Sequence, residues 1–288
     1  MRLVLGLTAA LAVAELVGGL VGGSLALLAD AGHMLSDVGS LSLALGALWL
    51  AARPPTARMS FGFRRAEILA ALFNGVALVA IAIWIFVEAA RRLSDPPEIL
   101  AGTTLAVALA GLAVNVLGVA ILWRSGGRSL NLRAALLHVV ADLLGSVGVI
   151  VAAVVILATG WLYADPLMSV LIGVLVLASS WRVLRESLGV LLEAAPQGID
   201  ADEVGRRMAA VDGVSEVHDL HIWTITSGFP ALSAHVLVPE GEDCHARRRD
   251  LSEMLRRDFG IGHTTLQVEH GDAHGAPVRV WLSERRTT

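Results

Sequence analysis

Long runs of apolar residues fill the first two thirds of the chain, with few polar interruptions. A helix that crosses the hydrocarbon core of a bilayer needs about 20 mainly apolar residues, because it rises only about 1.5 Å per residue. Gly22-Gly23-Ser24 is the weak point between the first two runs and predicts a turn there. The pattern predicts six membrane-spanning helices, which cover residues 2–21, 25–51, 67–92, 100–123, 131–157 and 164–190.

The last part of the chain changes to the shorter patterns of a soluble domain. Helical spacing of apolar residues marks residues 200–212 and 244–259, and strand patterns mark residues 214–226, 231–238 and 264–269. This αββαβ order predicts a small α+β domain of ferredoxin-like type. We therefore expect a membrane domain over residues 1–193, a soluble domain over 194–271 and a flexible end over 272–288.

Composition agrees with this division. Hydrophobic residues make up 55% of the chain and charged residues 17%, whereas soluble proteins average about 25% charge. This excludes a disordered, collagenous or disulfide-rich secreted protein. The single cysteine, Cys244, rules out an internal disulfide and predicts a reducing compartment. The net charge of −4 predicts no nucleic-acid partner.

Arginine placement predicts the orientation in the membrane. Nine arginines lie in the loops and helix ends on one side of the membrane, from the end of span two to the end of span six. Only Arg91 and Arg92 lie on the other side. Because cytoplasmic loops are enriched in basic residues, both termini are expected in the cytoplasm and the spans in the inner membrane of a cell. A signal peptide cleaved near Ala29-Asp30-Ala31 is the competing interpretation. The apolar stretch before it is too long, and Glu15 interrupts it.

Spans two and five carry the same pattern, His-x-x-x-Asp, in His33/Asp37 and His138/Asp142. Residues four apart share one face of a helix. Two facing pairs offer four nitrogen and oxygen ligands, the number that tetrahedral zinc needs. A carboxylate near the bilayer centre costs at least about 2.5 kcal/mol, which a bound dication offsets. The alternative is a pair of neutral His–Asp hydrogen bonds inside the bundle.

Other polar residues in the spans are less informative. Asp30 lies one turn before His33 and suggests an outer-gate metal ligand or a proton carrier, with an interhelical hydrogen bond as the alternative. For the remaining polar residues, hydrogen bonds between helices are favoured. Small-x-x-x-small spacing at Gly18, Gly19, Gly22 and Gly23 predicts helix packing. The residues for which hydrogen bonds between helices are favoured are Glu15, Glu67, Asn74, Glu88 and Asn115.

With these motifs, the chain resembles the cation diffusion facilitator family, specifically its bacterial zinc-exporter branch. The resemblance implies six spans, a cytoplasmic C-terminal domain, a homodimer in the lipid bilayer and exchange of a divalent metal for protons. It also implies a transport site formed by His33, Asp37, His138 and Asp142, and histidine at the first position of both pairs suits zinc. The matching stretches are residues 28–37, 61–75, 138–142, 217–223 and 263–269.

The chain also departs from some members of that family. The loop at residues 125–131 contains no histidine, and residues 52–65 contain no His, Asp, Glu or Cys. We therefore predict no second metal site in the loop between spans two and three.

The tail offers His218, His221, His235, His263 and Glu269 as candidate metal ligands. His218 and His221 are three residues apart and face opposite sides of a regular strand. The family resemblance favours His218 with His235 and Glu269, whereas a simple hairpin centred on Gly228 places His221 opposite His235. Ordinary surface histidines are the alternative.

The sequence thus predicts a transporter, not an enzyme, that exports Zn²⁺ from the cytoplasm in exchange for protons by alternating access. Zinc is expected both as transported substrate and as regulatory ligand of the tail. An intramembrane metallohydrolase would need a motif such as His-Glu-x-x-His, which is absent. A non-transporting, membrane-anchored zinc sensor is the other alternative.

Overall fold

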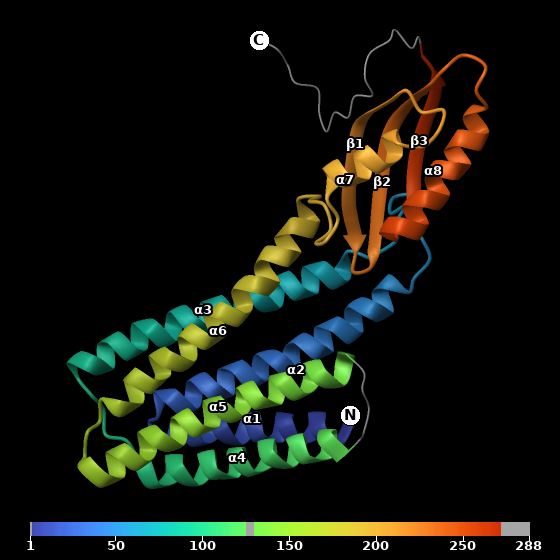
Figure 1. Ribbon diagram of the computed structural model, residues 1–288. Coiled ribbons are helices and arrows are strands. Elements are labelled where there is room, and N and C mark those ends of the chain that lie inside the picture. The colour runs from blue at the N-terminus through green and yellow to red at the C-terminus, as the bar shows by residue number, and fades with distance from the viewer. Residues whose placement is uncertain (1, 125–129, 272–288) are drawn as a thin grey trace. The chain divides into compact units, whose positions relative to one another are not determined.

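The computed structural model describes residues 2–124 and 130–271, and of residues 2–5, 7, 41, 44, 118, 121–124 and 130–141 it describes the backbone alone. The chain forms two compact units, residues 1–46 with 70–184 and residues 47–69 with 185–288 (Figure 1). The flexible end predicted at residues 272–288 lies outside the described residues.

Six long helices fold from the six apolar runs, each within two residues of the predicted bounds. Within the described residues, α2, α3, α6 and the Asp142–Thr159 part of α5 are long and apolar enough to cross a membrane. In α1 and α4 the apolar described segments are shorter, at Thr8–Gly22 and Ala101–Leu117. The helices are α1 (Arg2–Gly22), α2 (Leu25–Ala51), α3 (Ala66–Ser94), α4 (Ala101–Arg124), α5 (Leu130–Thr159) and α6 (Ala164–Leu191).

The predicted turn at residues 22–24 is confirmed, and a carboxylate from α6 caps the helix that follows it. Gly23 has φ 69°, a left-handed conformation that glycine adopts without strain. Asp165 accepts hydrogen bonds from the Ser24 hydroxyl (2.5 Å) and the Leu25 amide (2.8 Å). The Arg92 guanidinium lies 3.7 Å from the same carboxylate. The first amides of α2, which have no partner within the helix, are thereby satisfied.

Glycines allow the helices of this unit to approach closely. A Cβ atom on Gly18 of α1 would lie 2.8 Å from the Val107 side chain of α4, so the packing role predicted for Gly18 is confirmed. A Cβ on Gly173 of α6 would lie 2.7 Å from the ring of Phe86 in α3. Such contacts set how far apart neighbouring helices lie, and so which polar side chains meet between them.

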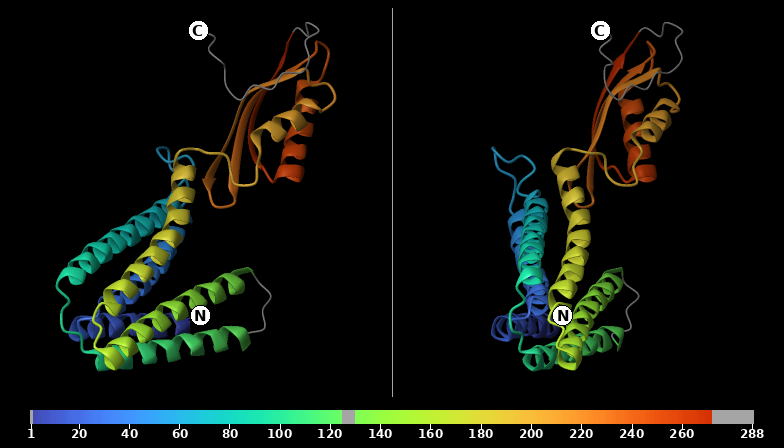
Figure 2. Two further views of the ribbon diagram at one scale, coloured as in Figure 1. Left: turned by 60° about the vertical axis from the view of Figure 1, so that its left-hand side comes forward. Right: turned by 90° about the vertical axis from the view of Figure 1, so that its left-hand side faces the viewer.

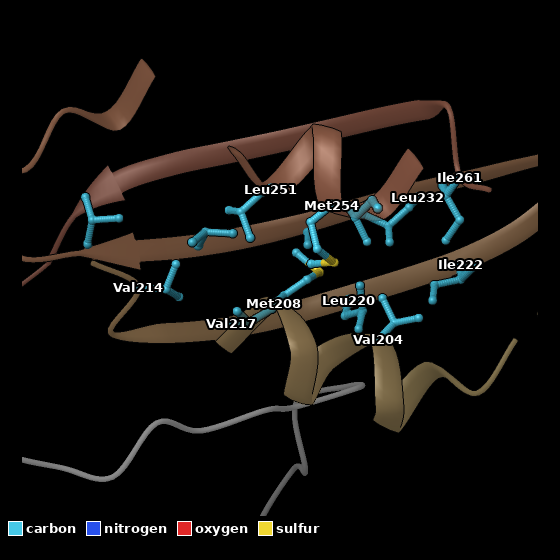
Figure 3. Close-up of a cluster of buried hydrophobic side chains, with 14 residues drawn as sticks. Val204, Met208, Val214, Val217, Leu220, Ile222, Leu232, Leu251, Met254 and Ile261 are labelled. Atoms are coloured by element: carbon cyan, nitrogen blue, oxygen red, sulfur yellow. The ribbon is translucent and has the colours of Figure 1, made fainter. Parts of the chain in front are cut away.

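The tail has the predicted αββαβ order: α7 (Ala201–Ala209), β1 (Glu216–Thr226), β2 (Phe229–Val238), α8 (Cys244–Phe259) and β3 (His263–His270). The sheet order is β1-β2-β3, with β1 antiparallel and β3 parallel to β2. Both helices lie on one side of the sheet (Figure 2). Their apolar side chains, including Met208 and Leu251, form one buried core with the strands (Figure 3). Neither α7 nor α8 covers the opposite face.

Candidate metal centre

Helices α2 and α5 bring three predicted ligands together inside the helical bundle. The His33 Nε2 atom lies 3.6 Å from an Asp37 oxygen and 3.7 Å from an Asp142 oxygen. Within the described part of the chain, these residues form the one group of three His, Cys, Asp or Glu side chains whose donor atoms all lie within 4.8 Å of one another. An imidazole nitrogen and two carboxylate oxygens are a suitable donor set for zinc.

His138, the fourth predicted ligand, lies in α5 one turn before Asp142, and its side chain is outside the described part of the structure. Counted from the centres of the predicted spans at about 1.5 Å per residue, the two His–Asp pairs would lie at depths that differ by about 10 Å. The 3.7 Å distance between the His33 Nε2 atom and an Asp142 oxygen shows that these two residues nevertheless meet. A count along each helix is uncertain by a few residues at the predicted bounds and takes no account of helix tilt, and either can absorb such a difference.

A cavity of about 470 Å³ lies beside these donors. Asp30, His33 and Asp37 line its polar part, and apolar side chains of α3, α5 and α6 line most of the rest. Asn74 also lines it and accepts a 2.8 Å hydrogen bond from Ser36, which ties α3 to α2 at this level. The cavity gives a small ion room beside its ligands within an otherwise apolar bundle.

Asp30 lies outside the three-residue donor group, although it faces the same cavity. Its side chain is buried, and one of its oxygens accepts a 3.4 Å hydrogen bond from the Ser146 hydroxyl of α5. The geometry therefore places Asp30 beside the candidate metal site, and its two suggested roles, metal ligand and proton carrier, stay predictions.

In the tail, the expectation that His218 and His221 face opposite sides of the strand is wrong. Strand β1 has a bulge between them, because His218 pairs with His235 and His221 pairs with Ser233. One extra residue on β1 shifts the alternation, so that both histidines point away from the core. The hairpin that would place His221 opposite His235 is also wrong, because Thr226 pairs with Phe229 and a second irregularity follows between Thr224 and Thr226, so that His221 pairs with Ser233.

The bulge residue, Asp219, was missed by reasoning from the sequence. It has φ 52°, a conformation that aspartate tolerates better than most residues. Its carboxylate lies 2.9 Å from the His221 Nε2 atom and 3.8 Å from that of His235. The rings of His218 and His235 are 5.3 Å apart. We call these four residues the histidine face.

The other two tail candidates lie elsewhere on the sheet. Glu269 projects from β3 and accepts a hydrogen bond from Gln267, the residue that pairs with His235. His263 begins β3 opposite Ala231, and its ring packs against Phe229 with centroids 5.6 Å apart. Glu269 is thus near the histidine face, whereas His263 lies six residues before Glu269 on the strand.

Comparison with known families agrees with both parts of the chain. Residues 1–192 match the model of the cation efflux transmembrane domain, and residues 196–271 match that of the cation efflux protein cytoplasmic domain. The chain belongs to the cation efflux family. These proteins are also called cation diffusion facilitators, so the resemblance found in the sequence is confirmed.

Several curated cation efflux proteins are similar over nearly their whole length. Zinc transporter ZitB of Escherichia coli is 44% identical over 94% of this chain and 87% of its own. The cadmium, cobalt and zinc/H⁺-K⁺ antiporter of Bacillus subtilis is 44% identical over 89% of this chain and 84% of its own. The metal cation efflux system protein CzcD of Cupriavidus metallidurans is 43% identical, over 93% and 85% respectively. The similarity therefore covers both parts of the chain.

Proposed function

We propose that this cation efflux protein exports Zn²⁺ from the cytoplasm in exchange for protons, through a site between α2 and α5. The observation that carries the proposal is the group formed by His33, Asp37 and Asp142, with donor atoms within 4.8 Å inside an apolar helical bundle. Relatives named as zinc transporters and as a cadmium, cobalt and zinc antiporter support the choice of substrate. His138 completes a four-ligand set in this proposal.

The same residues would couple zinc to protons. An imidazole must be neutral and a carboxylate ionised to bind metal, so zinc loading displaces protons. When the site opens to the other side, protons rebind these groups and zinc leaves. The dication offsets the two carboxylates while it is bound, and protons replace it in the return step. Arginine placement supports cytoplasmic termini, and the family of cation efflux proteins supports export.

In the tail, we propose that His218, His235 and Glu269 bind regulatory zinc in a homodimer. The shared face of the two histidines and the nearby Glu269 support this ligand set. Exposed Asp219 and His221 are further donors beside them. Zinc bound on this face would favour one arrangement of the two tails and so adjust transport.

The first test measures zinc flux and internal pH together in proteoliposomes, for wild type and Asp142→Ala. Zinc entry with opposed proton movement is expected for wild type, and neither for the variant. Asp95→Ala is the control, since this aspartate is exposed at the end of α3, and it should transport normally. Zinc transport by Asp142→Ala at the wild-type rate would overturn the proposed site. No flux with wild type, while zinc still binds the tail, would favour a sensor.

A further inference from the structure

Glu15, on α1, is a fully buried carboxyl group that the proposed metal site does not use. Its side chain is 0% exposed. Among the described atoms, neither carboxylate oxygen has a hydrogen-bond partner. An ionisable residue inside a membrane helix is costly and usually functional. The hydrogen bonds between helices that the sequence favoured for such residues are not formed by Glu15 in this part of the structure.

Two glycines make room for buried carboxyl groups. A Cβ atom on Gly111 of α4 would lie 2.6 Å from Glu15 Oε1, and one on Gly145 of α5 would lie 2.6 Å from Asp30 Oδ1. Neither position tolerates a larger residue without movement of the carboxyl group. In both cases, a glycine on the facing helix leaves the space that the carboxyl group of Glu15 or Asp30 occupies.

Buried polar side chains lie between Glu15 and the metal cavity, although among the described atoms no hydrogen bond joins Glu15 to them. The Cβ position on Gly111 that nearly touches Glu15 is also 3.6 Å from the Ser146 hydroxyl. Ser146 donates to Asp30 at 3.4 Å and accepts from the Asn115 amide at 3.3 Å. All these polar side chains are at most 5% exposed, and Asp30 lines the cavity that also contains His33.

The charged groups around Glu15 are acidic. Asp30 of α2 and Asp142 of α5 interact with it electrostatically, and Asn115 of α4 is neutral. The sequence contains no arginine or lysine between Arg2 and Arg53, between Arg92 and Arg124 or between Arg133 and Arg182. An apolar site with several carboxyls and no arginine or lysine can be neutralised by protons when metal is absent.

We propose that Glu15 is a proton-binding residue of the transport cycle, separate from the metal ligands. The proposal rests on the zinc–proton exchange proposed above. Glu15 lies seven residues before the end of α1 at Gly22, on the side expected to face outwards. It takes up a proton there as a carboxylic acid. The proton then passes through Ser146 and Asp30 to the ligand that releases zinc, which leaves Glu15 ionised for the next cycle.

The test compares full-length wild type and Glu15→Gln in proteoliposomes, with zinc and internal pH recorded at several external pH values. Glutamine keeps the size of the side chain but cannot release a proton at these pH values. We expect zinc affinity in detergent within about twofold of wild type, because no ligand changes. Zinc flux should fall about 100-fold, the low end of what a positioned proton-transfer group contributes, and lose its dependence on external pH. Glu15→Asp should restore part of the zinc flux and part of its dependence on external pH.

Matched variants separate this role from a structural one. Glu88→Gln is the control, because this glutamate of α3 forms a 3.1 Å ion pair with Arg92, and its proton coupling should not change. Gly111→Ala should reproduce the Glu15→Gln defect, whereas Gly102→Ala on the same helix meets nothing within 4 Å and should not. An unchanged pH profile in Glu15→Gln, or in Gly111→Ala if Glu15→Gln does not fold, would overturn the proposal. Loss of zinc binding in Glu15→Gln would also overturn the proposal. Wild type that moves zinc without protons would refute the exchange itself.

Discussion

The membrane unit and the tail both gather histidine and aspartate, yet their surroundings differ sharply. In the membrane site, the side chains of His33 and Asp142 are 17% and 6% exposed. On the histidine face, those of His235 and Asp219 are 41% and 55% exposed. Water can solvate the second group without any metal, whereas the first has few other ways to offset its charge. The same residue types are therefore much stronger indicators of function inside the bundle than on the sheet.

The sharpest test of this comparison removes one histidine from each region. His33→Ala should lower zinc flux about 100-fold or more, since even residues that merely orient metal ligands contribute 10- to 100-fold. His235→Ala should change flux at saturating zinc by about twofold at most, because it lies outside the proposed path. Proteoliposome flux measures both. Equal losses would mean that the tail takes a direct part in transport.

The next effect concerns whether the tail is stable by itself. Its core contains side chains from α7, α8, the sheet and the segments that connect them, and Leu251 is fully buried there. Leu251→Ala should lower the free energy of unfolding of an isolated tail by about 2–5 kcal/mol, through lost burial and the cavity left behind. Urea unfolding measures this value. Arg248→Ala, at an exposed position of the same helix, should have almost no effect, and a similar loss there would contradict the core assignment.

Zinc binding on the histidine face should depend less on any single residue than zinc transport depends on His33. His235→Ala should weaken zinc binding to the tail about tenfold, because exposed neighbours such as Asp219 and His221 can still donate. Calorimetric titration measures the affinity. His245→Ala, on the first turn of α8, is the control. If it weakens binding equally, the metal site lies elsewhere in the tail.

The smallest expected effect is a pH dependence in the tail. Hydrogen bonds from Arg257 and then Arg207 hold the pKa of Asp258 below its ordinary value. A carboxyl group with a lowered pKa contributes stability above its ordinary pKa and loses it as pH falls towards the folded-state pKa. Between pH 6 and pH 3, wild type should therefore lose slightly more stability than Asp258→Asn in thermal unfolding. Identical pH profiles would show that this exposed pair contributes nothing.

Much of the fold follows from the sequence because local rules determine it. The thickness of a bilayer sets the length of a spanning helix, so apolar runs predicted all six helix bounds closely. Period-two alternation predicted the strands. The bulge at Asp219 was not predicted, because the alternation rule assumes a regular strand and one inserted residue moves every later side chain to the other face. Val217, Leu220 and Ile222, all buried at spacings of three and two, are the signal that could have revealed it.

The sequence by itself determined which residues share a helix face, since His33 and Asp37 are one turn apart in any helix. Only the tertiary structure decided which faces meet, because tilt and glycine contacts set the distances between helices. It brought Asp142 to His33 and gave the carboxyl groups of Glu15 and Asp30 their places on Gly111 and Gly145. A helix fixes distances along its own axis, whereas distances between helices depend on packing of the whole bundle.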